Sequence, residues 1–186
     1  VTHVAPHGAI DEFLDCVIDG DSDFRFFLPN AVHARYINSA RAVAMFRAGF
    51  QEVRIGYESH SRSFHSQHGA KYARGGIEEA VTSLAAAGFS RSDITLYVLA
   101  GLPGQRPEEV EASIHEAAKF GARVEISEFS AVPGSALWTR CVAESIFPIE
   151  SEPTYQNNTV FPMRSSRFSV EDLKALKSIV AKIRHE

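Results

Sequence analysis

The segment Leu96-Tyr-Val-Leu-Ala-Gly-Leu-Pro-Gly-Gln105, followed by Arg106-Pro-Glu-Glu109, decides the fold. An apolar run of strand length stops there at a glycine–proline turn, and a helix with Pro107 in its first turn follows directly. This order predicts a βα junction, at the end of the strand where α/β proteins bind their ligands. Because Gly101 and Gly104 have no Cβ, a flat ligand could lie against the main chain at this turn. A tight turn with no further role explains the segment alone equally well.

Units of the same kind repeat along the chain at intervals of about thirty residues. The β-rich runs are Phe24–Leu28, Glu52–Tyr57, Ile94–Ala100 and Arg123–Phe129. The helical patterns are Asp11–Asp19, His33–Ala48, Gly75–Ala87 and Glu108–Phe120. Each helical pattern ends at a glycine, the residue that most easily takes the left-handed conformation past a helix end. Helices that alternate with strands predict an α/β fold with a parallel sheet, in a single domain.

Polar and apolar residues alternate in the predicted strands, as in the run from Val53 to Glu58. A sheet covered by helices on both faces would show continuous Val, Ile and Leu instead. The alternation therefore predicts a curved sheet with helices on one face and a wet, charged cavity on the other. The expected cavity side chains are Arg25, Arg54, Glu58, Tyr97 and Glu125.

The chain changes character beyond Phe129. A short helix is expected at Ala136–Glu144, and the stretch Pro148–Arg167 is irregular and rich in Pro, Asn and Ser. Ser169-Val-Glu-Asp172 resembles a capping box that opens a final helix to about Arg184. We therefore expect residues 1–145 to form a partial barrel, with residues 146–186 as an irregular extension and a C-terminal helix packed on the same domain.

A long loop from Glu58 to Gly69 follows the second strand at its functional end. Its histidines, His60, His65 and His68, could together hold zinc. Solvated histidines are the favoured interpretation, because Glu58 is the one carboxylate close by in sequence and no thiol lies near.

The composition excludes several classes of function. A net charge of −4 without a basic block gives no reason to expect nucleic acid or a membrane surface as a partner. The two cysteines, Cys16 and Cys141, are far apart, and this fits a reducing cytoplasm. The N-terminus shows no signal-peptide pattern, and the chain opens on Val1 without an initiator Met. We expect a cytoplasmic protein that is part of a longer polypeptide.

Three strand ends together resemble a known family. Ile55-Gly-Tyr-Glu-Ser59, the segment Leu96–Gln105 and Glu128-Phe-Ser-Ala-Val-Pro-Gly134 are similar to successive strand ends of radical S-adenosylmethionine (SAM) enzymes. The nearest branch contains cobalamin-associated and coproporphyrinogen-oxidase-like members. Leu28-Pro-Asn30 with His33-Ala-Arg35 resembles the third strand end of that branch, and the resemblance runs from about Phe24 to Phe161. Asn157-Asn158 is similar to a polar pair that follows the barrel in some members.

The resemblance implies about four βα units of a partial (β/α)₆ barrel, plus the C-terminal helix. In the family, a [4Fe–4S] cluster on three cysteines reduces SAM and generates a 5′-deoxyadenosyl radical. This sequence has no Cys-x₃-Cys-x₂-Cys, so the cluster is expected only in a full-length protein and not on this chain. A glycine-rich motif for the SAM amino group is also absent, unless Val4-Ala-Pro-His7 is its remnant. The chain alone is expected to be inactive.

The resemblance also implies roles for single residues at the SAM site. Glu58 and Ser59 match the strand end that approaches the ribose hydroxyls, although an ion pair between Glu58 and Arg54 is an alternative. Leu99 would offer main-chain groups to adenine, next to the turn Gly101-Leu-Pro103. The chain departs from the motif here, because Tyr97 and Gly104 stand where many members have Gly and Glu.

The last strand end would also lie close to adenine. Phe129 and Ser130 match that position, whereas a buried Phe beside a structural turn at Pro133-Gly134 is the alternative. Asn30 would line the substrate cavity, or else serve as a turn residue or helix N-cap. Lys71 stands where related chains often carry a lysine, and a solvated lysine is favoured.

The first hypothesis is thus the C-terminal part of a radical SAM enzyme core, which supplies the ribose and adenine side of the SAM site and part of the cavity for a small-molecule substrate. A non-catalytic half-barrel that binds a nucleoside-like ligand, and a fragment of another (β/α)₈ enzyme, are the alternatives. Since a partial barrel leaves the Phe24–Leu28 edge unpaired, we expect dimerisation or coverage by the N-terminal cluster-binding region of the full-length chain.

Overall fold

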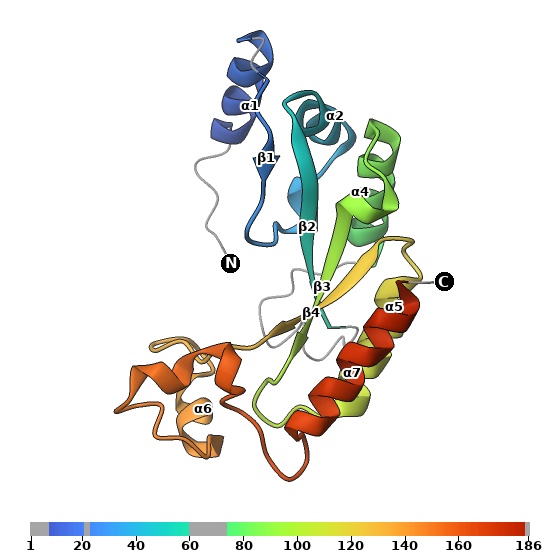
Figure 1. The fold of residues 1–186 in the computed structure, drawn as a ribbon. Coiled ribbons are helices and arrows are strands. Elements are labelled where there is room, and N and C mark those ends of the chain that lie inside the picture. The colour runs from blue at the N-terminus through green and yellow to red at the C-terminus, as the bar shows by residue number, and fades with distance from the viewer. Residues whose placement is uncertain (1–7, 21–22, 60–73, 185–186) are drawn as a thin grey trace.

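The computed structural model describes residues 8–20, 23–59 and 74–184, and a sheet of four parallel strands forms its centre (Figure 1). The spatial order is β1-β2-β3-β4, the same as the order along the chain. The predicted α/β class and the parallel sheet are therefore confirmed. The strand bounds are β1 Phe26–Phe27, β2 Phe50–Glu58, β3 Ile94–Ala100 and β4 Arg123–Glu128.

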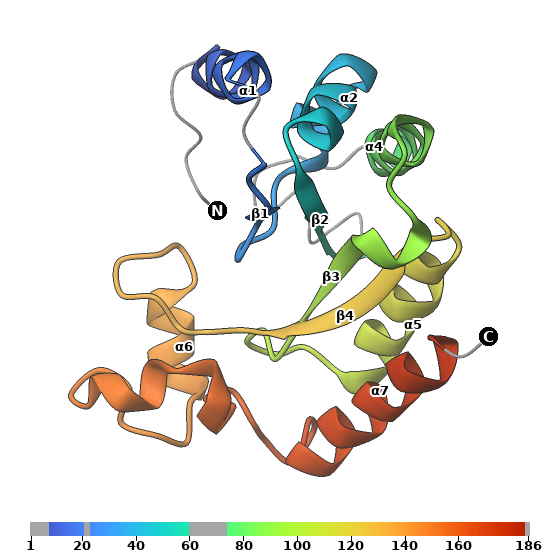
Figure 2. The ribbon, with the colours of Figure 1, turned by 45° about the horizontal axis from the view of Figure 1, so that its top comes forward.

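Five helices cover the outer face of this sheet in an arc (Figure 2). Val53, Ile55, Leu96 and Val98 point outward and are completely buried, because they pack under the helices. No helix within the described ranges is long and apolar enough to cross a bilayer. The bounds are α1 Ala9–Asp19, α2 Ser39–Arg47, α4 Arg74–Ala87, α5 Pro107–Ala118 and α7 Val170–Ile183.

The predicted helix His33–Ala48 is wrong in its first third. A single 3₁₀ turn, η1, occupies Ala34–Tyr36, and α2 starts only at Ser39. The cause is Asn38, which has extended backbone geometry and whose Oδ1 accepts the N–H of Arg41 at 2.9 Å. A side chain that satisfies the first free N–H groups of a helix fixes the start of that helix.

The edge strand β1 is shorter than predicted. Within the described residues it pairs with β2 alone, and Phe26 donates its N–H to the carbonyl of Gly49 at 3.0 Å. The ring of Phe26 stacks on that of Phe50, with 5.2 Å between centroids, and so ties the strand to the sheet. Three further rings, those of Phe13, Phe24 and Phe27, remain exposed around this edge.

A lobe built from the chain beyond β4 lies apart from the helical arc (Figures 1 and 2). It contains α6, Trp138–Glu144, and two 3₁₀ turns, η3 at Pro153–Gln156 and η4 at Asn158–Val160. Its own small core is made by Ala131, Cys141, Ile149 and Met163. Ala131 and Cys141 precede position 145, the expected end of the partial barrel, and Ile149 and Met163 follow it. The chain then runs from the lobe to α7.

The capping box of the last helix forms as predicted. Ser169 Oγ accepts the N–H of Asp172 at 3.1 Å, and Asp172 Oδ2 accepts the N–H of Ser169 at 2.8 Å. The Asp172 carboxylate accepts from both the N–H and the hydroxyl of Ser169, and these two bonds lower the pKa of Asp172, with the Ser169 N–H as the largest cause. Helix α7 runs from this cap along α5 and contacts β4.

Candidate functional site

A cavity of about 660 Å³ opens on the inner face of the sheet, toward the carboxyl ends of the strands. Residues 29–33 after β1 form one wall, and residues of β2, β3 and β4 form the rest. Its polar side chains are those of Asn30, His33, Glu58, Tyr97, Glu125, Ser127 and Glu128. The cavity thus lies on the polar face that the strand alternation predicts.

Glu58 reaches this cavity through an irregularity in β2. The pairing with β3 slips between Gly56 and Glu58, so that Tyr57 is an extra residue in the ladder. Glu58 has a φ of 64°, in the left-handed region that residues with a side chain rarely occupy. A bulge of this kind bends a strand and redirects the next side chain. The backbone therefore presents Glu58 to the cavity at a cost in strain, which is frequent at binding sites.

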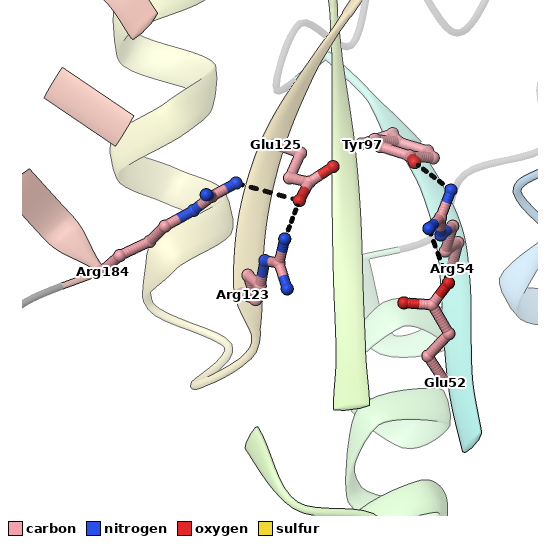
Figure 3. Close-up of polar contacts among 6 residues, drawn as sticks. All are labelled: Glu52, Arg54, Tyr97, Arg123, Glu125 and Arg184. Carbon is pink, nitrogen blue, oxygen red and sulfur yellow. Dashed lines mark hydrogen bonds and ion pairs between the residues drawn. The ribbon is translucent and has the colours of Figure 1, made fainter. Parts of the chain in front are cut away.

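Arg54 pairs with residues other than Glu58. Its Nη2 lies 2.5 Å from Glu52 Oε1, and its Nη1 donates to the hydroxyl of Tyr97 at 3.0 Å (Figure 3). Burial alone would lower the pKa of Arg54, but the charges of Tyr97, Glu52 and Glu125 outweigh burial and raise it. Arg54 does not line the cavity, but it is hydrogen-bonded to Tyr97, which does.

Helix α7 supports the β4 side of the cavity. Glu125 Oε1 accepts from Arg184 of α7 at 2.9 Å, and Arg123 bonds to the same oxygen (Figure 3). Lys177 of α7 forms an ion pair with Glu128. Cations therefore pair with two of the three carboxylates that line the cavity, Glu125 and Glu128. Within the described residues, no cation forms an ion pair with Glu58.

The turn after β3 is satisfied by its own side chains. Gln105 Oε1 accepts the N–H groups of Gly101 at 2.8 Å and Leu102 at 3.1 Å, and Gln105 Nε2 donates to the carbonyl of Leu99 at 3.1 Å. A flat group does lie against Gly101, but it is the side-chain ring of Phe161 and not a ligand. A Cβ at Gly101 would stand 2.6 Å from the ring of Phe161.

The remaining predicted residues lie outside the cavity lining. Ser59 is buried, and Ser130 Oγ accepts the N–H of Asn158 at 3.2 Å. Phe129 packs on the core of the lobe, and Arg25 is exposed before β1. Leu102 and Pro103 are buried in the turn. Outside the described residues lie Lys71, His60, His65, His68 and the segment from Val4 to His7.

Three polar residues line the cavity without having been among the expected cavity side chains: Ser127, Glu128 and His33. Ser127 lies on the same face of β4 as Glu125, so the alternation of polar and apolar residues could have predicted its place in the cavity. Glu128 stands at the end of β4, where polar residues of parallel strands gather. No sequence pattern predicts the place of His33 in the cavity, because His33 was expected to begin a helix.

The described residues do not fit an iron–sulfur cluster. They contain no group of three or more His, Cys, Asp or Glu side chains that could hold a metal. Cys16 is exposed and Cys141 is buried in the lobe. Burial raises the pKa of the Cys141 thiol, which disfavours the thiolate that a cluster needs.

No protein-family model matches the sequence, and no curated protein matches it. Solved structures of radical SAM enzymes do match the fold. Coproporphyrinogen III oxidase from Escherichia coli, a radical SAM enzyme, aligns with a TM-score of 0.60 and 12% identity over 94% of this chain and 36% of that chain. A radical SAM methyltransferase from Kitasatospora setae, solved with cobalamin and a [4Fe–4S] cluster, aligns with a TM-score of 0.58 and 18% identity.

The methyltransferase alignment covers 74% of this chain and 29% of that chain. The chain therefore spans about a third of the length of the enzymes it matches. At such identities the likeness concerns the fold, which is that of part of a radical SAM (β/α) barrel. The predicted resemblance is confirmed at this level.

Proposed function

We propose that this chain is the part of a radical SAM enzyme core that forms the ribose side of the SAM site and one wall of the substrate cavity. The observation that carries the proposal is Glu58, which a strained bulge presents to a cavity of about 660 Å³. An ionised carboxylate accepts hydrogen bonds at both oxygens, and a ribose diol offers two donors at a matching spacing. Glu58 is thus suited to hold such a diol.

The chain's own contacts set limits on how the rest of SAM could bind. The Phe161 ring covers Gly101, so adenine would find its apolar contact at Leu99, which lines the cavity. The electron for the reductive cleavage of SAM would come from a cluster bound elsewhere in a longer protein. The residues described here would bind, orient and shield the ligands.

Titration calorimetry with SAM tests this proposal. Glu58→Gln should weaken SAM binding about tenfold, because one charge-assisted acceptor for the diol is lost. Glu79→Gln, an exposed change on α4, is the matched control and should leave the affinity unchanged. Equal affinities for the wild type and Glu58→Gln would contradict the proposal.

We also propose that the β1 edge is covered in the longer protein by a preceding strand of the same polypeptide. The support is the one-sided pairing of β1, the exposed rings of Phe24 and Phe27, and the match to about a third of each related enzyme. An unpaired edge with exposed rings binds another strand readily.

A further inference from the structure

A second cavity lies at the opposite end of β3 and β4, and it shares no lining residue with the first. Its volume is about 530 Å³. The wall comes from the turn η2, Arg91–Asp93, which precedes β3, from the start of β4, and from the end of α7. These three elements are distant in sequence, and each contributes one arginine to the cavity.

The three arginines are Arg91, Arg123 and Arg184, and no carboxylate lines the cavity with them. Two carboxylates lie just behind: Glu125 bonds to Arg123 and Arg184, and Asp93 bonds to the N–H and hydroxyl of Ser90. Among the described residues, these three positive charges stand against two negative ones, which leaves an excess of positive charge. Like charges held together in this way favour an anionic ligand.

Two further observations point to a ligand rather than to internal pairing. The Nε atom of Arg123 is buried and has no hydrogen-bond partner among the described residues. A buried donor without an acceptor is costly, and a turn of the Arg123 side chain toward the cavity would let a bound anion supply the acceptor. Arg91 is exposed and has no ion pair within the same part of the chain, so its guanidinium is available to a ligand.

We propose that this cavity binds the phosphate group of a small molecule. Three arginines that line one cavity from three elements match a tetrahedral anion with several acceptor oxygens, whereas a planar carboxylate offers only two oxygens. The apolar atoms of Val124 and Ile183 line the same cavity and would contact the organic part of a phosphate ester.

The test uses inorganic phosphate, phenyl phosphate and benzoate as probes, titrated calorimetrically into the protein at low ionic strength. We expect saturable binding of phosphate and about tenfold weaker binding by Arg91→Gln, since one charge-assisted contact is lost. Arg91→Gln removes no ion pair seen in the described residues, so the variant should fold normally. The control is Arg167→Gln, an exposed change near the opposite end of α7, which should bind phosphate as the wild type does.

The probes also separate the sources of the phosphate group. Tighter binding of phenyl phosphate than of inorganic phosphate assigns the site to an ester, and the reverse order assigns it to the free ion. The proposal is overturned if no saturable phosphate binding occurs up to about 10 mM, a range that includes weak sites. It is equally overturned if Arg91→Gln and Arg167→Gln have the same effect, or if benzoate binds as tightly as phenyl phosphate.

Discussion

At the scale of single residues, Glu58 combines a place in the cavity lining with an unfavourable backbone. Its φ of 64° is the kind that glycine adopts without cost, yet glycine would remove the carboxylate from the cavity. The bulge at Tyr57 produces this geometry, and the cavity uses it. Stability and the proposed ligand binding therefore make opposite demands on this position.

A pair of substitutions separates these demands. Relative to Glu58→Ala, Glu58→Gly should raise the free energy of unfolding by about 1 kcal/mol, because only glycine relieves the left-handed strain. Urea denaturation of the two variants measures the difference. Both lack the carboxylate, so the comparison isolates the backbone. A Gly variant that is no more stable than the Ala variant would show that the position carries no strain.

At the scale of elements, an ion pair fastens α1 to α2. Arg41 donates from Nε to Asp11 Oδ1 at 2.8 Å and from Nη2 to Asp11 Oδ2 at 2.7 Å. The same guanidinium donates to the carbonyl of Tyr36 at 2.6 Å. The hydrogen bond from Arg41, aided by its charge, lowers the pKa of Asp11 despite the opposing effect of burial. Since Asp11 is half exposed, solvent screens much of this attraction.

The lowered pKa gives the pair a defined pH dependence. Its contribution is complete above the unfolded pKa of about 3.9 and is lost as the pH falls through the lower folded pKa. Asp11→Asn should therefore lower the free energy of unfolding by up to about 1 kcal/mol at pH 7 and have little effect near pH 2. Denaturant melts at both pH values measure this.

Glu12→Gln is the control for that experiment. It removes a neighbouring exposed carboxylate from the same first turn of α1, so it reports the helix-dipole effect without the ion pair. A pH dependence that is the same for Asp11→Asn and Glu12→Gln would assign the effect to the helix dipole.

Features that depend on neighbours in sequence could be predicted, and contacts between distant segments could not. The bounds of β3 and the Ser169 capping box follow from local patterns of side-chain type. The cap at Asn38 competes with a continuous helical pattern, and propensity alone does not decide between them. The bond from Arg184 to Glu125 joins residues 59 apart. The Phe161 ring on Gly101 depends likewise on how the lobe returns to the sheet.

The site shows the same division. The alternation in β2, β3 and β4 indicated the polar inner face, and the structure places Glu58, Tyr97 and Glu125 in the cavity there. The sequence could not predict which cations pair with these carboxylates. Lys177 of α7 and Arg184, directly after α7, come from the far end of the chain.

At the scale of the whole molecule, the exposed edge predicts self-association of the 186-residue chain. Phe27 is 64% exposed beside the unpaired side of β1. Phe27→Lys should shift the chain toward monomer, because a charge on an edge strand opposes pairing with another strand. Light scattering after size-exclusion chromatography, over a range of concentrations, measures the shift.

The matched control is Ile146→Lys, because Ile146 is 63% exposed but lies just past α6, in the lobe. It should leave the mass distribution as in the wild type. If the unsubstituted chain is monomeric at every concentration, the proposed role of this edge is contradicted.

The contact between Gly101 and Phe161 has a consequence for evolution. A Cβ at 101 would stand 2.6 Å from a ring that is itself buried and fixed by a left-handed backbone at 161. Neither position can change freely while the other stays as it is. Among homologous sequences, a side chain at 101 should therefore occur together with a smaller residue than Phe at 161. The two positions should covary, although they lie in different segments of the chain.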